Sequence, residues 1–415
     1  MNLHLKKSTC NLKSEIAITG SKSETNRLLL LQALYPNIEI QNTSKSDDSE
    51  VMQAALKNLQ LSDINSQVVD IHHAGTAMRF LTAFFAIQDN KETVLTGSAR
   101  MHERPIKILV DGLTQLGAKI EYLQNDGFPP LKIIGTEITA NKVTLNANVS
   151  SQYISALLLI APKLKNGLEL LLEGEITSVP YLKMTVELLN QIGVETTFEE
   201  NRITVNPKSQ IANSKLIIES DWSSASYWYS IVALSEVGTK ITLSSYKKNS
   251  LQGDAALVEI YKNFGVQTVF NNDNSVIISK ISNVQLETLN LTLNNAPDIA
   301  QTIAVTSFGL CIECNLYGLH TLKIKETDRL EALKTELLKL GATISVTDNS
   351  LHLKASKSIN QNISITTYQD HRMAMAFAPL ALKVPIIIEN AQVVSKSYPT
   401  FWEDLKKSGF DFLEY

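Results

Sequence analysis

The sequence predicts an α/β protein built from six similar units that form two domains of three units each. One pattern recurs along the chain: an amphipathic helix ends in glycine, and a small apolar residue and a β-branched strand follow. The copies lie about 70 residues apart, which is too long for a solenoid repeat. The length of 415 residues also exceeds what one hydrophobic core normally serves.

Each copy of the repeat carries the same local signals. Leu or Ile at helical spacing gives an apolar stripe, and a glycine just past the last turn supplies a left-handed cap. The five clear copies carry Gly117, Gly193, Gly265, Gly341 and Gly409. VMQAALKNLQLSDIN, near residue 51, is a degenerate sixth copy. Further short strands and one more apolar helix separate the copies.

The domain boundary is predicted between the third and fourth copies, near Ser220 to Trp222. Gly20 opens the first loop that carries a motif, so residues 1–19 are expected to pair with the second domain. The predicted domains are 20–221, and 1–19 together with 222–415.

Composition excludes several classes of protein. An apolar fraction of 44% with 19% charged residues is typical of a globular chain rather than a disordered one. The net charge of -4 argues against a nucleic-acid or anionic-membrane binder. Any anion site must therefore come from a local concentration of cations.

The N-terminal segment has no apolar core like that of a signal peptide, and three cysteines favour a reducing compartment, so we expect a cytoplasmic protein. Met373 to Ile388 contains two prolines and a lysine, and predicts a buried helix followed by a strand. Cys311 and Cys314 are expected to be a buried pair of small apolar side chains.

The arginines mark candidate anion sites. Only seven of the 38 basic residues are Arg, which suggests that Arg is used where a carboxylate or phosphate must be held by two parallel hydrogen bonds. Six of them fall in the segments GSKSETNR, HAGTAMR, ARMHERP, KETDR and DHR. Arg202, in EENRITV, is expected to be structural and to lie in a hairpin.

Each segment also has a purely structural interpretation. Lys325 and Arg329 lie four residues apart at a helix start, where like charges destabilise the helix unless an anion sits between them. Asp370 and Ser150 could be helix caps only, and Asp298 a first-turn helix residue. Gly75 could be an ordinary turn glycine rather than one that admits a ligand to the backbone.

Together these segments resemble a known family. GSKSETNR, HAGTAMR, RMHERPI, SSQYISALL, SVPY, PDIAQT, KIKETDRL, YQDHRMAM and SKSYP occur in the order seen in the 3-phosphoshikimate 1-carboxyvinyltransferase (EPSP synthase) family. The resemblance spans roughly residues 15 to 405. It implies two domains, each of three βαβαββ-type repeats around a pseudo-threefold axis (an inside-out barrel), with the active site in the interdomain cleft.

The resemblance also implies a reaction. Shikimate 3-phosphate attacks C2 of phosphoenolpyruvate through its 5-hydroxyl, C3 takes a proton, and the tetrahedral intermediate loses phosphate. No metal or organic cofactor takes part, and small-molecule substrates are the expected partners of a monomeric protein in aromatic amino acid (chorismate) biosynthesis. The first domain would mainly bind shikimate 3-phosphate, and the second would contribute the catalytic carboxylates and phosphoenolpyruvate-binding cations.

Roles transfer to this sequence by motif match. The residues implied to bind shikimate 3-phosphate are Lys22, Ser23, Arg27, Ser150, Ser151, Gln152, Ser178, Tyr181, Asp298, Thr321 and Lys325. Those implied to bind phosphoenolpyruvate are Lys22, Gly75, Arg104, Gln152, Arg329, Arg372 and Lys396. Asp298 would accept the proton of the attacking hydroxyl, Glu326 would handle the proton at C3, and Lys22 is a third catalytic residue.

Electrostatics supports this assignment independently. Two like charges 4 Å apart repel by roughly 4 kcal/mol at an effective dielectric near 20. Bringing both anionic substrates together therefore requires several cations. The motifs supply seven: Lys22, Arg27, Arg104, Lys325, Arg329, Arg372 and Lys396.

Three positions depart from the family pattern. His73 stands where the family often has Asn, Phe80 where it often has Pro, and Thr321 where an Asn contacts shikimate 3-phosphate. Because Gly75 is retained, glyphosate is expected to compete with phosphoenolpyruvate.

Two alternatives stay open at the level of sequence. A UDP-N-acetylglucosamine enolpyruvyl transferase would share the repeats, but it typically has a Cys on a mobile loop, and the RMHERPI segment has none. A non-catalytic phosphometabolite-binding protein would need the cations but neither Asp298 nor Glu326.

Overall fold

The computed structural model describes residues 1–61, 66–147, 150–174 and 176–415, and side chains 58–61 are left aside. The chain divides into two compact units, one of Gly20–Ile218 and one of Met1–Thr19 with Glu219–Tyr415. The chain passes from one unit to the other between residues 19 and 20, where the sequence analysis predicts the boundary. It passes back between residues 218 and 219 rather than 221 and 222, because the Ser220 hydroxyl already donates to the Ile18 carbonyl of the second unit.

The first unit, Gly20–Ile218, contains two complete repeats. In each, a buried helix connects two parallel strands. A second helix follows, and an antiparallel hairpin then completes the four-stranded sheet. One repeat comprises β4 (Ser66–Asp70), α3 (Gly75–Ala86), β5 (Glu92–Thr96), η1 (Met101–Glu103), α4 (Lys107–Gln115), β6 (Lys119–Tyr122) and β7 (Leu131–Ile134). The other comprises β8 (Lys142–Asn146), α5 (Ser151–Ile160), η2 (Ala161–Lys163), β9 (Leu168–Glu173), α6 (Val179–Gln191), β10 (Thr196–Glu199) and β11 (Arg202–Val205).

The third repeat of this unit begins and ends at the two chain crossings. It comprises α1 (Lys22–Leu34), β3 (Ile38–Gln41), α2 (Asp47–Leu61) and β12 (Ser214–Ile217). β12 pairs in parallel with β3. α2 covers most of the degenerate sixth copy, and residues 62–65 of that copy lie outside the described residues.

The second unit contains three repeats of the same kind. The first comprises β2 (Lys13–Ile16), α7 (Trp222–Leu234), β13 (Lys240–Leu243), η3 (Gly253–Ala256), α8 (Leu257–Ile260), η4 (Tyr261–Phe264), β14 (Val266–Phe270) and β15 (Val276–Lys280). The second comprises β16 (Thr288–Thr292), η5 (Pro297–Ile299), α9 (Ala300–Gly309), β17 (Glu313–Tyr317), η6 (His320–Ile324), α10 (Arg329–Lys339), β18 (Ile344–Val346) and β19 (Ser350–Leu353). The third comprises β20 (Ile363–Ile365), α11 (His371–Phe377), η7 (Ala378–Leu382), β21 (Ile386–Ile388), η8 (Ala391–Lys396), α12 (Phe401–Lys407), β22 (Phe412–Glu414) and the N-terminal β1 (Leu3–Leu5).

The N-terminal segment pairs as expected. β1 lies between β21 and β22, and β2 pairs in parallel with β13. The two crossing strands are exchanged between repeats: β2 leads into α1 but pairs within the second unit, while β12 leads into α7 but pairs within the first. Each unit therefore completes one of its sheets with a strand from a distant part of the chain.

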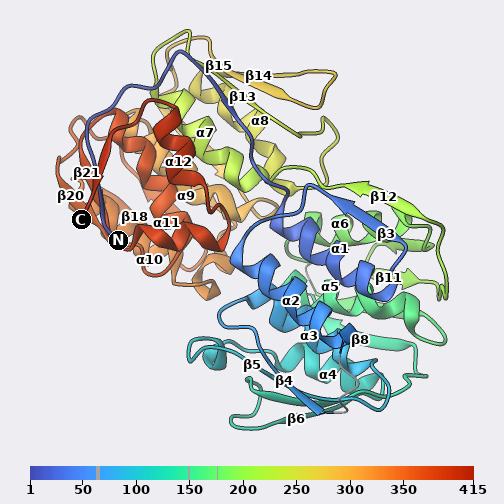
Figure 1. Cartoon of the computed structure of the whole chain (residues 1–415). Helices are drawn as coiled ribbons and strands as arrows, with labels where there is room; N and C mark the ends of the chain where they lie inside the picture. The colour runs from blue at the N-terminus through green and yellow to red at the C-terminus, as the bar shows by residue number, and fades with distance from the viewer. Residues whose placement is uncertain (62–65, 148–149, 175) are drawn as a thin grey trace. The chain divides into compact units, whose positions relative to one another are not determined.

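Three largely buried helices pack together in each unit, and their places are marked in Figure 1. In one unit α1, α3 and α5 pack against one another, and in the other α7, α9 and α11 do so. All residues of α3 and α9 are buried, which agrees with helices that are apolar on every side. The N-terminal ends of these helices carry most of the motif residues, so the repeat itself positions the candidate site.

The five predicted cap glycines are confirmed. All of them have positive φ, from 73° at Gly265 to 102° at Gly409, and each lies between a helix and a strand. Arg202 begins the second strand of the β10–β11 hairpin and pairs with Glu169, as expected of a structural arginine. Met373 to Ile388 forms α11, η7 and β21, which confirms the predicted buried helix and strand.

The prediction of a buried cysteine pair is wrong for one member. Cys314 is fully buried in β17, but Cys311 is exposed. Cys311 lies just after α9 with a φ of 60°, in the turn that reverses the chain before β17. Its side chain therefore faces solvent, while that of Cys314 faces the core.

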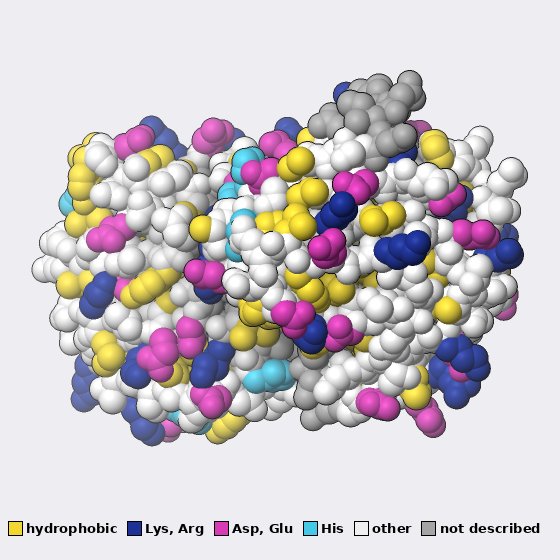
Figure 2. Space-filling view, turned by 90° about the horizontal axis from the view of Figure 1, so that it is seen from below, with side chains coloured by type: hydrophobic (Ala, Val, Ile, Leu, Met, Phe, Trp, Pro, Cys, Tyr) yellow, Lys and Arg dark blue, Asp and Glu magenta, His cyan; other side chains and the backbone are white. Residues whose placement is uncertain are grey.

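The surface agrees with the near-neutral composition. On the face shown in Figure 2, Lys and Arg side chains alternate with Asp and Glu rather than forming one basic patch. Within the described part of the chain, no helix is long and apolar enough to cross a membrane.

Candidate active site

Arg27, on the second turn of α1, connects three helices of the first unit. It is 2% exposed, and its Nε donates to the Thr185 hydroxyl at 2.8 Å. Its Nη1 donates to the Ser23 carbonyl at 2.8 Å and its Nη2 to the Ser155 hydroxyl at 3.0 Å. Burial lowers the pKa of Arg27 to about 10, which still leaves the guanidinium charged at neutral pH. This positive charge has only neutral hydrogen-bond acceptors among the described residues.

Phe80, one of the departures from the family pattern, contributes to the same site. It is fully buried on α3, and its ring centre lies 5.5 Å from the Arg27 guanidinium carbon. The centre of the Tyr181 ring lies 5.9 Å from the same carbon. Such cation–π contacts stabilise a desolvated guanidinium, so the change to Phe provides Arg27 with an additional aromatic neighbour.

Gly75, the first residue of α3, lies directly against Arg104. A Cβ built at Gly75 would be 2.4 Å from the Arg104 Nη1, so only glycine leaves room for this guanidinium. Arg79, one turn along α3, donates to the Gly75 carbonyl at 2.9 Å. The Arg104 guanidinium has no hydrogen-bond or ion-pair partner among the described residues. Burial, followed by the nearby Arg104 charge, lowers the pKa of Arg79 to about 10. An anion bound here would offset this repulsion.

Two further helix starts lie near Gly75 and Arg27. Ser150 caps α5 by accepting from the Gln152 backbone N–H at 3.4 Å, which confirms its cap role. The Gln152 side chain donates to the Thr76 hydroxyl at 3.3 Å, and so joins the starts of α5 and α3. Ser151 is buried in the first turn of α5. Ser178 precedes α6 with a left-handed backbone, and Tyr181 follows in the first turn.

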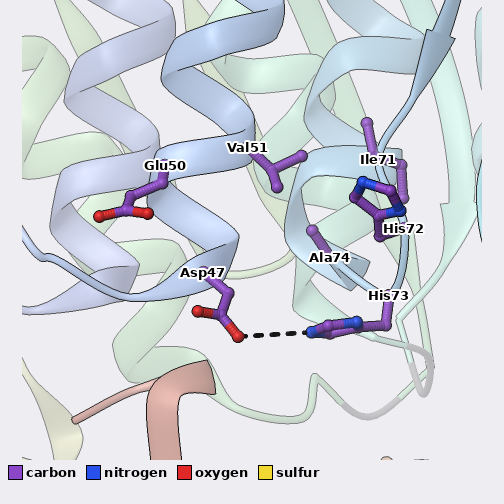
Figure 3. Close-up of a pocket in the computed structure, with 7 residues that line it drawn as sticks. All are labelled: Asp47, Glu50, Val51, Ile71, His72, His73 and Ala74. Atoms are coloured by element: carbon purple, nitrogen blue, oxygen red, sulfur yellow. Dashed lines mark ion pairs between the residues drawn. The ribbon is translucent and has the colours of Figure 1, made fainter. Parts of the chain in front are cut away.

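Lys22 begins α1 and faces a carboxylate. Its Nζ lies 3.9 Å from the carboxylate of the largely buried Asp48, which limits where the ammonium can point. A small pocket nearby is lined by Asp47, Glu50 and Val51 of α2 and by the turn before α3 (Figure 3). There His73 turns toward Asp47, with 3.7 Å between its Nε2 and the carboxylate. The departure at His73 thus places an imidazole ring two residues before Gly75.

Asp298 is the centre of the second unit's motif residues. Its carboxylate is 2.8 Å from Arg329 Nη1, 3.4 Å from Lys325 Nζ and 3.6 Å from Arg372 Nη2. Arg372 also donates to the Asp298 backbone carbonyl at 3.0 Å. Burial alone would raise the pKa of Asp298, but Lys325, Arg372 and Arg329 together hold it well below its usual range. Asp298 is therefore an ionised hydrogen-bond acceptor within a cluster of cations.

Arg329 is held by three carboxylates. It is 2% exposed, and its Nε lies 2.7 Å from the fully buried Asp370 carboxylate. Its Nη1 and Nη2 lie 2.8 Å from Asp298 and Glu326 respectively. Burial acts to lower the pKa of Arg329, but Asp370, Glu326 and Asp298 outweigh it and raise the pKa above its ordinary value. The segments PDI, KETDR and DHR meet at this side chain.

The structure corrects the placement of Lys325. The sequence analysis takes Lys325 and Arg329 as neighbours on a helix, but α10 begins at Arg329 and Lys325 is extended. Asp328 caps α10 instead by accepting from Leu330 N at 3.1 Å. The two cations are brought together by Asp298, which pairs with both, rather than by helical spacing.

Other predicted residues of this unit lie around the same cluster. Asp370 caps α11 by accepting from the Arg372 backbone N–H at 2.9 Å. Lys396, at the end of η8, donates to the Gln369 carbonyl at 2.8 Å, next to that cap. Thr321 lies on η6 with its hydroxyl oxygen buried and without a hydrogen-bond partner in the described part of the chain.

Comparison with known proteins decides the family. The model of the EPSP synthase (3-phosphoshikimate 1-carboxyvinyltransferase) family matches residues 6–405. The chain belongs to the EPSP synthase family. A 3-phosphoshikimate 1-carboxyvinyltransferase of Bacteroides fragilis is 45% identical over 404 residues, 96% of each chain. One of Colwellia psychrerythraea is 34% identical over 418 residues, 95% of this chain and 96% of that one.

Solved structures agree on the fold. An EPSP synthase of Acinetobacter baumannii superposes with a TM-score of 0.81 at 20% identity, and all of both chains is covered. An enolpyruvyl transferase of Streptomyces tendae has a TM-score of 0.75 at 13% identity, covering 99% of this chain and 98% of that one. The predicted mixed α/β fold of the EPSP synthase family is therefore confirmed.

Several residues of the site gave little signal in the sequence. Asp370 could be identified only as a helix cap, because its pairing with Arg329 joins residues 41 positions apart. Asp48 and Thr76 lie beside motif residues but resemble ordinary helix residues. Ser223 contacts both Arg372 and Asp254, but the three residues are far apart in the sequence and only the fold brings them together.

Loss of the Asp370 charge is predicted to destabilise the second unit strongly. Asp370→Asn would leave the buried Arg329 with one carboxylate fewer, at a cost of about 3 kcal/mol of unfolding free energy. Urea unfolding followed by circular dichroism measures this change.

Glu259→Gln is the matched control, since it removes an exposed ion pair with Lys262 in the same unit. Such pairs contribute about 0.5 kcal/mol. Equal effects of the two substitutions would contradict the role assigned to Asp370.

Proposed function

We propose that this chain transfers the carboxyvinyl group of phosphoenolpyruvate to the 5-hydroxyl of shikimate 3-phosphate, using the residues that match the family motifs. The observation that carries the proposal is the Asp298 carboxylate in contact with Lys325, Arg329 and Arg372. A buried carboxylate among three cations offers both a hydrogen-bond acceptor for a hydroxyl and positive charge for anionic substrates.

In the proposed reaction the oxygen of the 5-hydroxyl attacks C2 of phosphoenolpyruvate. Asp298 receives the hydroxyl proton, and a proton is added at C3, where Glu326 handles it. The tetrahedral intermediate then expels phosphate from C2, and C3 gives up a proton so that the enol ether forms. The sum is one carboxyvinyl ether and one inorganic phosphate.

The low pKa of Asp298 suits this role only if it rises when substrates bind. Without ligands, three cations stabilise the carboxylate and make it a weak base. Substrate phosphate and carboxylate groups compete for the same cations. Their binding would draw positive charge away from Asp298 and raise its pKa toward the range useful for general-base catalysis.

Glu326 is better placed for proton exchange than Asp298. Both carboxylates form an ion pair with Arg329, but the Glu326 side chain is 25% exposed and that of Asp298 only 9%. A more exposed carboxyl group can exchange protons with solvent and deliver them to C3. We therefore assign the two carboxylates to separate proton transfers.

The residues of the first unit would bind the substrates' anionic groups. The starts of α5 and α6, with Ser150, Ser151 and Ser178, offer hydroxyl groups and the partial positive charge of a helix start to the phosphate of shikimate 3-phosphate. Arg104, beside Gly75, would bind phosphoenolpyruvate together with Gln152. Lys22 would serve both substrates.

The names of the two relatives support 3-phosphoshikimate as the acceptor rather than UDP-N-acetylglucosamine. We further propose that the protein works as a monomer in the cytoplasm, in the biosynthesis of aromatic amino acids. The three free cysteines fit a reducing compartment.

Phosphate release tests the reaction. The purified chain with phosphoenolpyruvate is expected to release phosphate with shikimate 3-phosphate but not with UDP-N-acetylglucosamine. Asp298→Asn should lower kcat by about a thousandfold, because the proton acceptor is lost. Asp273→Asn, at an exposed turn of the same unit, is the control and should leave kcat unchanged. Release with the nucleotide sugar alone, or full activity of Asp298→Asn, would overturn the proposal.

Gly75→Ala tests the phosphoenolpyruvate site. The added methyl group would push the Arg104 guanidinium aside, and this side chain is flexible enough for the fold to survive. The KM for phosphoenolpyruvate is predicted to rise about tenfold, as for loss of a charged hydrogen bond, with the KM for shikimate 3-phosphate within about twofold. Steady-state kinetics at saturating cosubstrate measures both. Equal increases in the two KM values would show that Gly75 does not serve the phosphoenolpyruvate site specifically.

A further inference from the structure

Asp254 is a buried carboxylate next to the cation cluster, and none of the family motifs includes it. It lies on η3 and is 5% exposed. It accepts a hydrogen bond from the hydroxyl of Ser223, the second residue of α7. No cation within the described residues forms an ion pair with it.

Ser223 connects Asp254 to Arg372. The Arg372 Nη2 donates to the Ser223 hydroxyl oxygen at 3.2 Å. A guanidinium can only donate, so Ser223 must accept from Arg372 and give its single hydrogen elsewhere. Asp254 takes that hydrogen. Because the Ser223 hydrogen points to the Asp254 carboxylate, the lone pairs of the hydroxyl oxygen are turned toward Arg372.

Arg372 is in turn oriented toward Asp298. Its Nη1 donates to the Asp298 carbonyl at 3.0 Å, and its Nη2 lies 3.6 Å from the Asp298 carboxylate. The planar guanidinium is therefore oriented by its contacts with both Asp298 and Ser223. If the Ser223 hydroxyl turns away, Arg372 loses one of these orienting contacts.

The loop that carries Asp254 is itself fixed to the start of α7. The Gln252 side chain accepts from the Trp222 backbone N–H at 2.9 Å and donates to the Ser220 carbonyl at 3.0 Å. These two bonds hold the residues on either side of the α7 start against η3. The distance between Asp254 and Ser223 is thus set by the backbone.

Ionisation of Asp254 is unfavourable in the folded protein. Burial, and then the nearby Asp298 carboxylate, raise the pKa of Asp254 to about 6, while Arg372 and the Ser223 hydroxyl lower it and Asp221 raises it slightly. A carboxyl group whose pKa is raised by folding destabilises the fold once it is ionised. Folding stability therefore does not explain an ionised carboxylate at this position, but a role in the site does.

We propose that Asp254 is a positioning residue for the transfer reaction, acting through Ser223 to hold the Arg372 guanidinium in the orientation that meets phosphoenolpyruvate. This inference rests on the proposed function, which assigns phosphoenolpyruvate to Arg372. It extends the site by two residues, Ser223 and Asp254.

Four variants test the relay: Asp254→Ala, Asp254→Asn, Ser223→Ala, and the double variant Ser223→Ala/Asp254→Asn. Asp254→Ala and Ser223→Ala should each raise the KM for phosphoenolpyruvate about tenfold, with the KM for shikimate 3-phosphate within about twofold. Asp254→Asn should keep most of the wild-type affinity, because the amide oxygen still accepts the Ser223 hydrogen. Because Asp254 acts only through Ser223, the double variant should be no worse than Ser223→Ala alone.

Ser230→Ala is the matched control, since Ser230 is a fully buried serine of the same helix outside the relay. It should change neither KM. Melting temperatures at pH 8 show whether a variant is folded, and Asp254→Asn should melt no lower than the wild type. If Asp254→Ala fails to fold, Ser223→Ala and the double variant still test the relay.

The outcomes separate this inference from the proposed function. A wild-type protein without turnover on shikimate 3-phosphate and phosphoenolpyruvate would overturn the proposed function and, with it, the role of Arg372. Wild-type turnover with an unchanged phosphoenolpyruvate KM in Ser223→Ala would overturn the relay alone. Equal changes in both KM values, or a double variant worse than Ser223→Ala, would also overturn it.

Discussion

The buried Arg329 is the side chain on which the second unit's site depends. One guanidinium meets Asp298, Glu326 and Asp370, which come from three different motifs. Burying such a group is costly, and its carboxylates repay that cost only while all of them are in place. The same contacts fix where the two candidate catalytic carboxylates lie. Folding and chemistry are thus coupled through a single residue.

The repeat architecture explains why the motifs converge. Each repeat has one largely buried helix, and these helices pack together at the centre of a unit. Their starts bring together Lys22, Gly75 and Ser151 in one unit, and Asp298 and Arg372 in the other. Helix starts carry partial positive charge and so favour anions, and the motif cations placed there strengthen this field although the chain as a whole is slightly acidic.

Local signals in the sequence were sufficient for the repeat but not for its connections. The cap glycines, such as Gly117 and Gly341, follow from the backbone requirements of a helix end, and their positive φ agrees. That residues 1–19 pair with the second unit is predicted from the sequence, but the particular partner strands of β2 and β12 are not, because strand pairing over about 200 residues leaves no local trace. Lys325 lies outside the helix because Asp328 caps α10, and its pairing with Asp298 could not be predicted because the two residues are distant in sequence.

The central claim is that Asp298 is ionised by its cations in the free protein and becomes more basic when substrate anions take them over. Carbon-13 NMR of aspartate-labelled protein, with the Asp298 signal assigned by its loss in Asp298→Asn, measures this directly. We predict a carboxylate that stays ionised at pH 4 without ligand and titrates at higher pH with shikimate 3-phosphate bound. Protonation near the ordinary aspartate pKa in the free protein, unchanged by the ligand, would contradict the account.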